Sequence, residues 1–128
     1  MAVKCVIVED ALFIREIYRF FLQGQGIDIV AEASDGLDAL EKIKLHQPDL
    51  IILDLVLPLK NGLDVLKEVS EISSQSKCLV ISSVDDEEIR SKALALGAIQ
   101  YVFKPFTKTQ LLDAVNLVIQ KYQEVQNG

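Results

Sequence analysis

Short apolar runs alternate with longer amphipathic segments along the whole chain. Apolar residues that recur at three- and four-residue spacing predict helices, whereas short apolar runs bounded by turn residues are typical of strands. The apolar runs predict strands at about 6–8, 27–33, 50–53, 78–81 and 99–103. The amphipathic segments that follow each of them predict helices at about 14–22, 37–47, 63–69, 85–96 and 109–122.

This strict alternation of strands and helices indicates an α/β fold with a parallel sheet. The run from Leu50 to Leu53 supports this interpretation, because a parallel strand is covered on both faces and needs no polar side. The 128 residues suit one domain, and no linker, repeat or low-complexity segment divides them. We therefore expect a single domain over residues 1–128, with its core at about 3–122.

The charge of the chain argues against two classes of partner. Lys and Arg number 13 against 19 Asp and Glu, which gives a net charge of −6. A chain this acidic repels nucleic acid and anionic lipid, so we expect no direct contact with nucleic acid. The most apolar stretch, Leu50 to Leu59, falls short of the ~20 residues that a spanning helix needs, so we expect no membrane insertion. With no signal-peptide pattern at the start, the expected location is the cytoplasm.

Polar side chains with chemical potential follow four of the predicted strands. Glu9 and Asp10 follow the first strand, Asp54 follows the third, Ser82 closes the fourth and Lys104 follows the fifth. The carboxyl ends of parallel strands meet at one edge of a sheet, where ligands bind in folds of this class. Any one of these residues alone would be read as solvated surface, but the set predicts a functional site.

The three carboxylates define the electrostatics of that site. Two unit charges about 5 Å apart repel by roughly 3 kcal/mol at an effective dielectric constant of ~20. Protons, the Lys104 ammonium or a metal ion could each relieve this repulsion, and hard oxygen ligands suit Mg²⁺. Asp54 can then be interpreted as a nucleophile toward a phosphoryl group, with Lys104 screening the transferred charge and Ser82 donating a hydrogen bond.

Together these residues resemble the receiver domain of two-component response regulators, and in particular the stand-alone CheY type of chemotaxis. The resemblance covers nearly the whole chain and depends on a set of short motifs: Glu9-Asp10, Asp54 with Pro58 four residues on, Asn61-Gly62, Ser82, Tyr101 and Lys104-Pro105-Phe106. It implies a flavodoxin-like, doubly wound (βα)5 fold with strand order 2-1-3-4-5.

The resemblance also implies a phosphoacceptor and a metal site. Asp54 would accept a phosphoryl group from the phosphohistidine of a histidine kinase or of a phosphotransfer protein. Asp10 and Asp54 would ligate Mg²⁺ directly, with Mn²⁺ as a substitute. Glu9 would act mainly through water, and the backbone carbonyl of Val56 would supply a further ligand.

A switch is implied as well. Ser82 and Lys104 would bond the phosphoryl group, and Tyr101 would swing inward into the space that Ser82 leaves. The Lys104–Pro105 peptide bond would be cis. A downstream protein would bind the face formed by the fourth helix, fifth strand and fifth helix, and we expect a monomer, with a dimer left open.

Departures from the commonest receiver pattern give further expectations. Val56 and Val84 are apolar at two positions that tune phosphate hydrolysis in this family, so we expect them to crowd the attacking water and to lengthen the lifetime of the phosphate. In the strand order of the family, Cys5 and Cys78 would lie roughly 10 Å apart on the first and fourth strands, too far apart for a disulfide.

The leading hypothesis is therefore a phosphorylation-driven switch in chemotaxis-type signalling. It would not be a turnover enzyme, although it would catalyse its own Mg²⁺-dependent phosphorylation and dephosphorylation weakly. A phosphorelay shuttle, the receiver of a truncated transcription factor and a non-phosphorylated interaction module remain alternatives. A phosphatase of the haloacid-dehalogenase type is more remote, because that family needs a second acid where this chain has Val56.

Overall fold

The computed structural model describes the backbone of residues 2–127 and the side chains of residues 2–120. Five strands and five helices alternate along these residues, as the sequence predicts. The strands are β1 (Val3–Val8), β2 (Ile27–Ala33), β3 (Leu50–Leu53), β4 (Lys77–Ser82) and β5 (Ala98–Phe103). The helices are α1 (Leu12–Leu22), α2 (Gly36–His46), α3 (Gly62–Ile72), α4 (Glu87–Ala95) and α5 (Lys108–Asn127).

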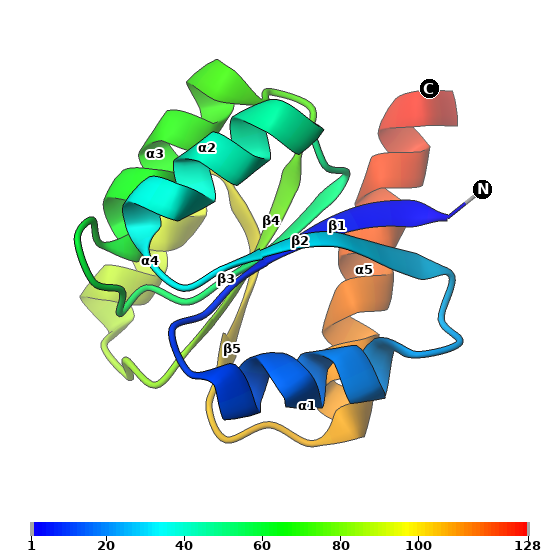
Figure 1. Ribbon diagram of the computed structural model, residues 1–128, viewed down its shortest axis with the longest axis horizontal. Helices are drawn as coiled ribbons and strands as arrows, with labels where there is room; N and C mark the ends of the chain where they lie inside the picture. Colours follow the sequence, from blue (N-terminus) through cyan, green and yellow to red (C-terminus); the bar gives the residue numbers. More distant parts are fainter. Residues whose placement is uncertain (1, 128) are drawn as a thin grey trace.

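All four strand pairings are parallel, and the strand order is β2-β1-β3-β4-β5 (Figure 1). The α/β class, the doubly wound sheet and the strand order 2-1-3-4-5 are thereby confirmed. The predicted boundaries agree with the structure to within three residues, except that α5 continues to Asn127 rather than ending at about 122. Within the described residues, no helix combines the length and apolar character needed to cross a membrane.

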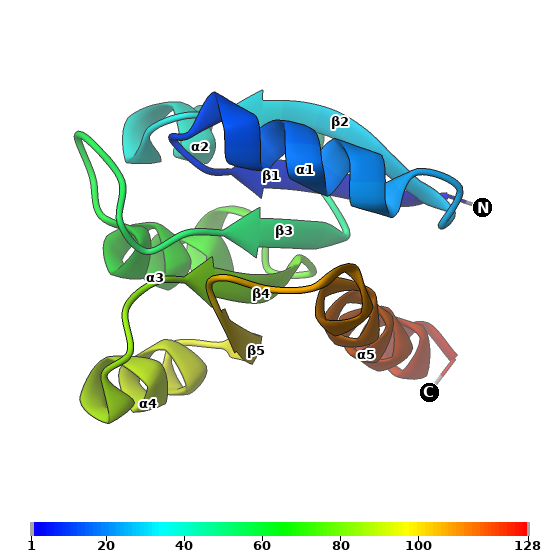
Figure 2. The same ribbon diagram turned by 90° about the horizontal axis from the view of Figure 1, so that it is seen from below.

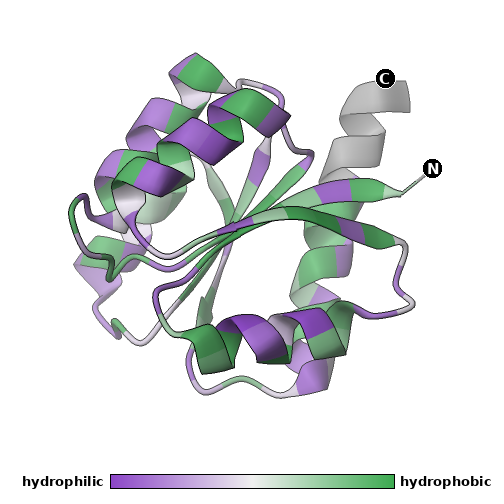
Figure 3. Cartoon of the chain, viewed as in Figure 1, coloured by the Kyte–Doolittle hydropathy of each residue, from purple (hydrophilic) through white to green (hydrophobic). Residues whose placement is uncertain are grey.

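Helices cover both faces of the sheet (Figure 2). One apolar layer joins the sheet to α2, α3 and α4, and the other joins it to α1 and α5. All four residues of β3 are buried, as a central strand between two helical layers requires. The strands are accordingly apolar along most of their length, whereas polar and apolar residues alternate around the helices (Figure 3). The predicted inward residue Tyr122 of α5 lies outside the described side chains.

The two cysteines are free and buried. Cys5 lies on β1 and Cys78 on β4, with β3 between them. Their side chains also belong to opposite apolar layers of the sheet. The prediction that they do not form a disulfide is therefore confirmed, and the sheet order explains why.

A glycine sets the position of the loop that carries Asp54. At Gly62, the first residue of α3, an added Cβ would lie 2.4 Å from the Leu55 Cα and 2.5 Å from the Asp54 carbonyl oxygen. The Gly62 N–H also donates to the Leu55 carbonyl at 2.9 Å. Any side chain here would push α3 away from the end of β3, so this glycine lets the helix begin directly beneath Asp54.

Candidate functional site

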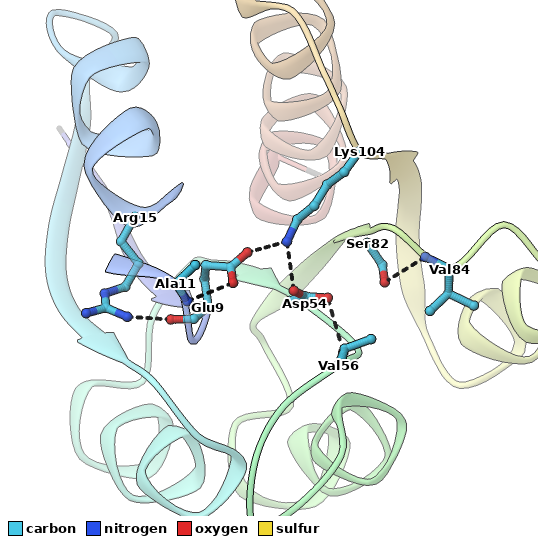
Figure 4. A network of polar contacts seen from close by, with 8 residues as sticks. All are labelled: Glu9, Ala11, Arg15, Asp54, Val56, Ser82, Val84 and Lys104. Atoms are coloured by element: carbon cyan, nitrogen blue, oxygen red, sulfur yellow. Dashed lines mark hydrogen bonds and ion pairs between the residues drawn. The ribbon is translucent and has the colours of Figure 1, made fainter. Parts of the chain in front are cut away.

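Three acidic side chains from two strand ends converge at the carboxyl edge of the sheet. Figure 4 shows two of them, Glu9 and Asp54, both joined to Lys104. Glu9 and Asp10 follow β1 and Asp54 follows β3, and ligand oxygens of all three lie within 4.8 Å of one another. Glu9 is 1 % exposed and Asp54 5 % exposed, whereas Asp10 faces solvent. Two buried carboxylates this close together need a compensating positive charge.

Lys104 supplies part of that charge from the loop after β5. Its ammonium Nζ donates to Asp54 Oδ2 at 2.8 Å and also to Glu9 Oε1. Its peptide bond to Pro105 is cis. The next residue, Phe106, stacks on Tyr18 of α1 with ring centroids 5.4 Å apart, so an aromatic contact anchors the loop that carries Lys104.

Burial and pairing shift the protonation of these groups in a consistent way. Burial raises the pKa of Glu9, and the hydrogen bond from Lys104 opposes that rise without cancelling it. Burial alone would lower the pKa of Lys104, but its hydrogen bonds to Asp54 and Glu9 outweigh burial and raise that pKa. The lysine therefore stays an ammonium at neutral pH and acts as the resident cation of the site.

Both oxygens of Asp54 are engaged. Oδ2 accepts from Lys104, and Oδ1 accepts from the Val56 N–H at 3.1 Å. The Val56 side chain is 55 % exposed, so the loop presents its backbone to Asp54 and its side chain to solvent. These two contacts fix the orientation of the Asp54 carboxylate at the tip of β3.

Ser82 and Tyr101 are linked through one residue of the loop after β4. The fully buried Ser82 accepts at Oγ from the Val84 N–H at 3.3 Å. The Tyr101 hydroxyl donates to the Val84 carbonyl at 2.8 Å, and its side chain is only 7 % exposed. Tyr101 is therefore buried and bonded to the same loop residue as Ser82, whereas its predicted inward swing upon phosphorylation stays a prediction.

Sequence reasoning missed one residue that contacts the site. Arg15 of α1 donates from Nη1 to the backbone carbonyl of Glu9 at 2.6 Å. It shares a helix face with the buried Tyr18 and Leu22, at spacings of three and seven residues. Nothing in the local sequence marks this contact, because Arg19 lies one turn further along the same helix face and only Arg15 bonds to Glu9.

The donor set fits a hard divalent cation. The formal charges of three carboxylates and one ammonium sum to two net negative charges within the site. Carboxylate oxygens from Glu9, Asp10 and Asp54 are the ligands that Mg²⁺ prefers, and the exposure of Asp10 leaves room for the waters that Mg²⁺ retains. The site is therefore compatible with Mg²⁺ in both charge and chemistry.

The fold and the site together define a doubly wound α/β domain with an acidic, lysine-bridged centre at the strand tips. Residues 5–116 match the family model of the response regulator receiver domain, and the chain belongs to that family. It is 35 % identical over 116 residues to chemotaxis protein CheY of Bacillus subtilis, covering 91 % of this chain and 97 % of that protein. Proteins of this family are response regulators of two-component signalling and act as switches.

Solved structures agree with this assignment. The receiver domain of AraT, a response regulator from Geobacillus stearothermophilus, matches with a TM-score of 0.90 at 30 % identity, covering 98 % of this chain and 99 % of that one. The CheX–CheY–BeF3–Mg²⁺ complex from Borrelia burgdorferi contains a chain that matches with a TM-score of 0.88 at 26 % identity, covering 91 % of this chain and 89 % of that one.

Proposed function

We propose that this protein accepts a phosphoryl group on Asp54 from a histidine kinase or a phosphotransfer protein, and that phosphorylation changes its affinity for a downstream protein. The observation that carries the proposal is the position of Lys104. Its ammonium bridges Asp54 and Glu9 at a sheet edge that also gathers Asp10 and Ser82.

The chemistry follows from the Asp54 contacts. A carboxylate oxygen of Asp54 attacks phosphorus, forming the P–O bond of an acyl phosphate as the P–N bond to the donor imidazole breaks. The imidazole nitrogen keeps the bonding electron pair, and the donor leaves as neutral imidazole because its other ring nitrogen carries the proton. Lys104 already lies 2.8 Å from Asp54 Oδ2 and stabilises the negative charge transferred there. Ser82 ends β4, the strand next to β3, and in this proposal its hydroxyl donates to a phosphoryl oxygen.

The proposed metal ligands are Glu9, Asp10 and Asp54, with the backbone carbonyl of Val56 as a fourth. When bound, Mg²⁺, or Mn²⁺ in its place, would neutralise charge on the phosphoryl oxygens and orient them. Glu9 would act mainly through water on the ion, and its two oxygens also accept from Lys104 and the Ala11 N–H. Asp10, which faces solvent, is the carboxylate with the freest approach for a hydrated ion.

The proposed switch runs from Ser82 and Lys104 to Tyr101. The output surface is the face formed by α4, β5 and α5, to which Tyr101 belongs. The likeness to CheY over nearly the full length of that protein favours chemotaxis as the pathway. A phosphorylation-dependent change in partner affinity of ~1–3 kcal/mol would be sufficient for signalling.

The test is phosphorylation with a small-molecule donor. Incubation with acetyl phosphate and Mg²⁺, followed by intact-protein mass spectrometry, should show one added phosphoryl group on the wild type and none on Asp54→Asn. Asp28→Asn is the matched control, because Asp28 is exposed on β2 and lies among neither the site residues nor their partners. Labelling of Asp54→Asn equal to that of the wild type would refute the proposal.

A further inference from the structure

The segment between β1 and α1 carries two of the three site carboxylates, yet α1 begins without the usual capping side chain. The N-cap residue is Ala11, no side chain bonds to the first turn as a cap, and the first turn has no acidic residue. Ser, Thr, Asp or Asn normally fixes the chain at this point. The direction in which Glu9 and Asp10 point therefore depends on other contacts.

Arg15 provides such a contact. Its Nη1 donates to the Glu9 carbonyl at 2.6 Å, while its Nε donates to Glu32 Oε1 on β2 at 3.0 Å. The Arg15 side chain is 15 % exposed and that of Glu32 is 21 % exposed, so the pair is largely shielded from water. In Figure 4 Arg15 reaches Glu9 from the side opposite Lys104. Glu9 is thus bonded through its backbone on one side and through its carboxylate on the other.

The guanidinium group suits this task better than other cations. It is planar and presents its donors in a fixed fork, so one side chain can bond a carboxylate and a carbonyl at the same time. Glu32 orients the fork by accepting from Nε, and β2 and α1 are thereby tied to the end of β1. Glu32 also accepts from Arg19 at 2.9 Å, but among the described residues Arg19 makes no hydrogen bond or ion pair with Glu9.

We propose that Arg15 is a positioning residue for the acidic site. By fixing the Glu9 carbonyl, it sets the direction of the Glu9 and Asp10 carboxylates and so the affinity for a divalent cation. This inference rests on the proposed function, which supplies the metal, but it concerns a residue that is no ligand and contacts no substrate. Residues that orient metal ligands from outside typically change metal affinity by about 10- to 100-fold when removed.

The experiment measures Mg²⁺ affinity by titration calorimetry with MgCl2 in Arg15→Met, Arg15→Lys and Arg19→Met. Arg15→Met should raise the Kd for Mg²⁺ about tenfold or more. Arg15→Lys keeps the charge but lacks the fork, so it should raise the Kd by a smaller factor. Arg19→Met removes an ion pair from the same Glu32 and should leave the Kd within about twofold of the wild type, since Arg19 does not reach Glu9.

Stability and metal affinity must be separated. Urea unfolding of each variant shows whether it is folded under the titration conditions, and if Arg15→Met is not, Arg15→Lys decides the question. A folded Arg15 variant with the wild-type Kd would overturn the proposal, and so would an equal loss in Arg19→Met. If Asp54→Asn binds Mg²⁺ as tightly as the wild type, the proposed metal site is itself wrong and both proposals fall. If the wild type binds Mg²⁺ and the Arg15 variants bind it with the same Kd, only the positioning role of Arg15 is overturned.

Discussion

The substitution Lys104→Met removes the cation that bridges Asp54 and Glu9 and leaves a side chain of similar length. Both carboxylates are buried, so neither can turn to bulk water for compensation. Without a bound metal ion, the variant must either keep two ionised carboxylates side by side or protonate one of them. The cheaper of these two alternatives sets the loss of stability.

Each alternative has a definite magnitude. Oxygens of Glu9 and Asp54 lie within 4.8 Å, so their repulsion is at least about 3.5 kcal/mol at an effective dielectric constant of about 20. Protonating a carboxyl of ordinary pKa at pH 7 would cost about 3.7 kcal/mol, and the cost for Glu9 is lower because burial raises the pKa of its carboxyl. Part of this loss of stability is offset, because the variant no longer has to bury the Lys104 ammonium. We expect the free energy of unfolding to fall by about 3 kcal/mol at pH 7 but by less than about 1 kcal/mol near pH 4, where protons are readily available.

Urea unfolding followed by far-ultraviolet circular dichroism at both pH values, in Mg²⁺-free buffer, measures this difference. Arg90→Met is the matched control, because the exposed pair of Arg90 with Glu87 should contribute less than about 1 kcal/mol at either pH. A loss in Lys104→Met that is equal at pH 4 and pH 7, or no larger than in the control, would refute the assignment of Lys104 as the resident cation.

Three further predictions concern the surroundings of the site. Leu59 has φ of +69°, a backbone conformation that favours glycine, and it is 76 % exposed. Leu59→Gly should therefore raise the free energy of unfolding by about 0.5–1 kcal/mol, as measured by urea unfolding. Leu45→Gly, at an equally exposed position in α2, should lower it. Burial raises the pKa of Glu9, so its proton binds more tightly to the folded than to the unfolded protein. Its stabilising contribution is complete below the unfolded pKa and is lost as pH rises through the folded pKa. The free energy of unfolding of Glu9→Gln, relative to that of the wild type, should therefore increase between pH 4 and pH 7 in urea unfolding. If this difference in free energy does not change with pH, the pKa of Glu9 is not raised by burial. Phosphorylated Asp54 should persist for longer than a few seconds in Mg²⁺, as measured by mass spectrometry of quenched samples. The double variant Val56→Asn, Val84→Asn should shorten that lifetime, because it gives the attacking water a polar neighbour. Decay of the wild-type phosphate within seconds would contradict the expectation.

The fold could be predicted from the sequence because each element has a local cause. The all-apolar β3 requires cover on both faces, and Asp86, whose carboxylate accepts from the Glu88 N–H at 2.9 Å, marks the start of α4 in the sequence itself. The strand order could not be predicted from local sequence in this way. Periodicity alone does not say which strands are neighbours, and the order came from the family resemblance.

The site was predictable only as far as strand ends determine it. Parallel strands bring Glu9, Asp54 and Lys104 to one edge whatever the side-chain details. The pairing of Lys104 with both carboxylates, and the contact of Arg15 with the Glu9 carbonyl, depend on rotamers and on the approach of α1 to β2. Local sequence carries no direct signal for these contacts, because their partners are 6 to 95 residues apart along the chain.

The link between Ser82 and Tyr101 shows how a local event at the strand tips could reach the edge of the sheet. Val84 donates its N–H to Ser82 Oγ and accepts at its carbonyl from the Tyr101 hydroxyl. Under the proposed function, a Ser82 hydroxyl that turns toward a phosphoryl group withdraws the acceptor of the Val84 N–H. Since an unpaired, part-buried amide is costly, the loop must then move to find another partner, and the Val84 carbonyl moves with it. Under the proposed function, Tyr101 would be coupled to Ser82 by two hydrogen bonds through Val84, so the switch needs no path of contacts across the core.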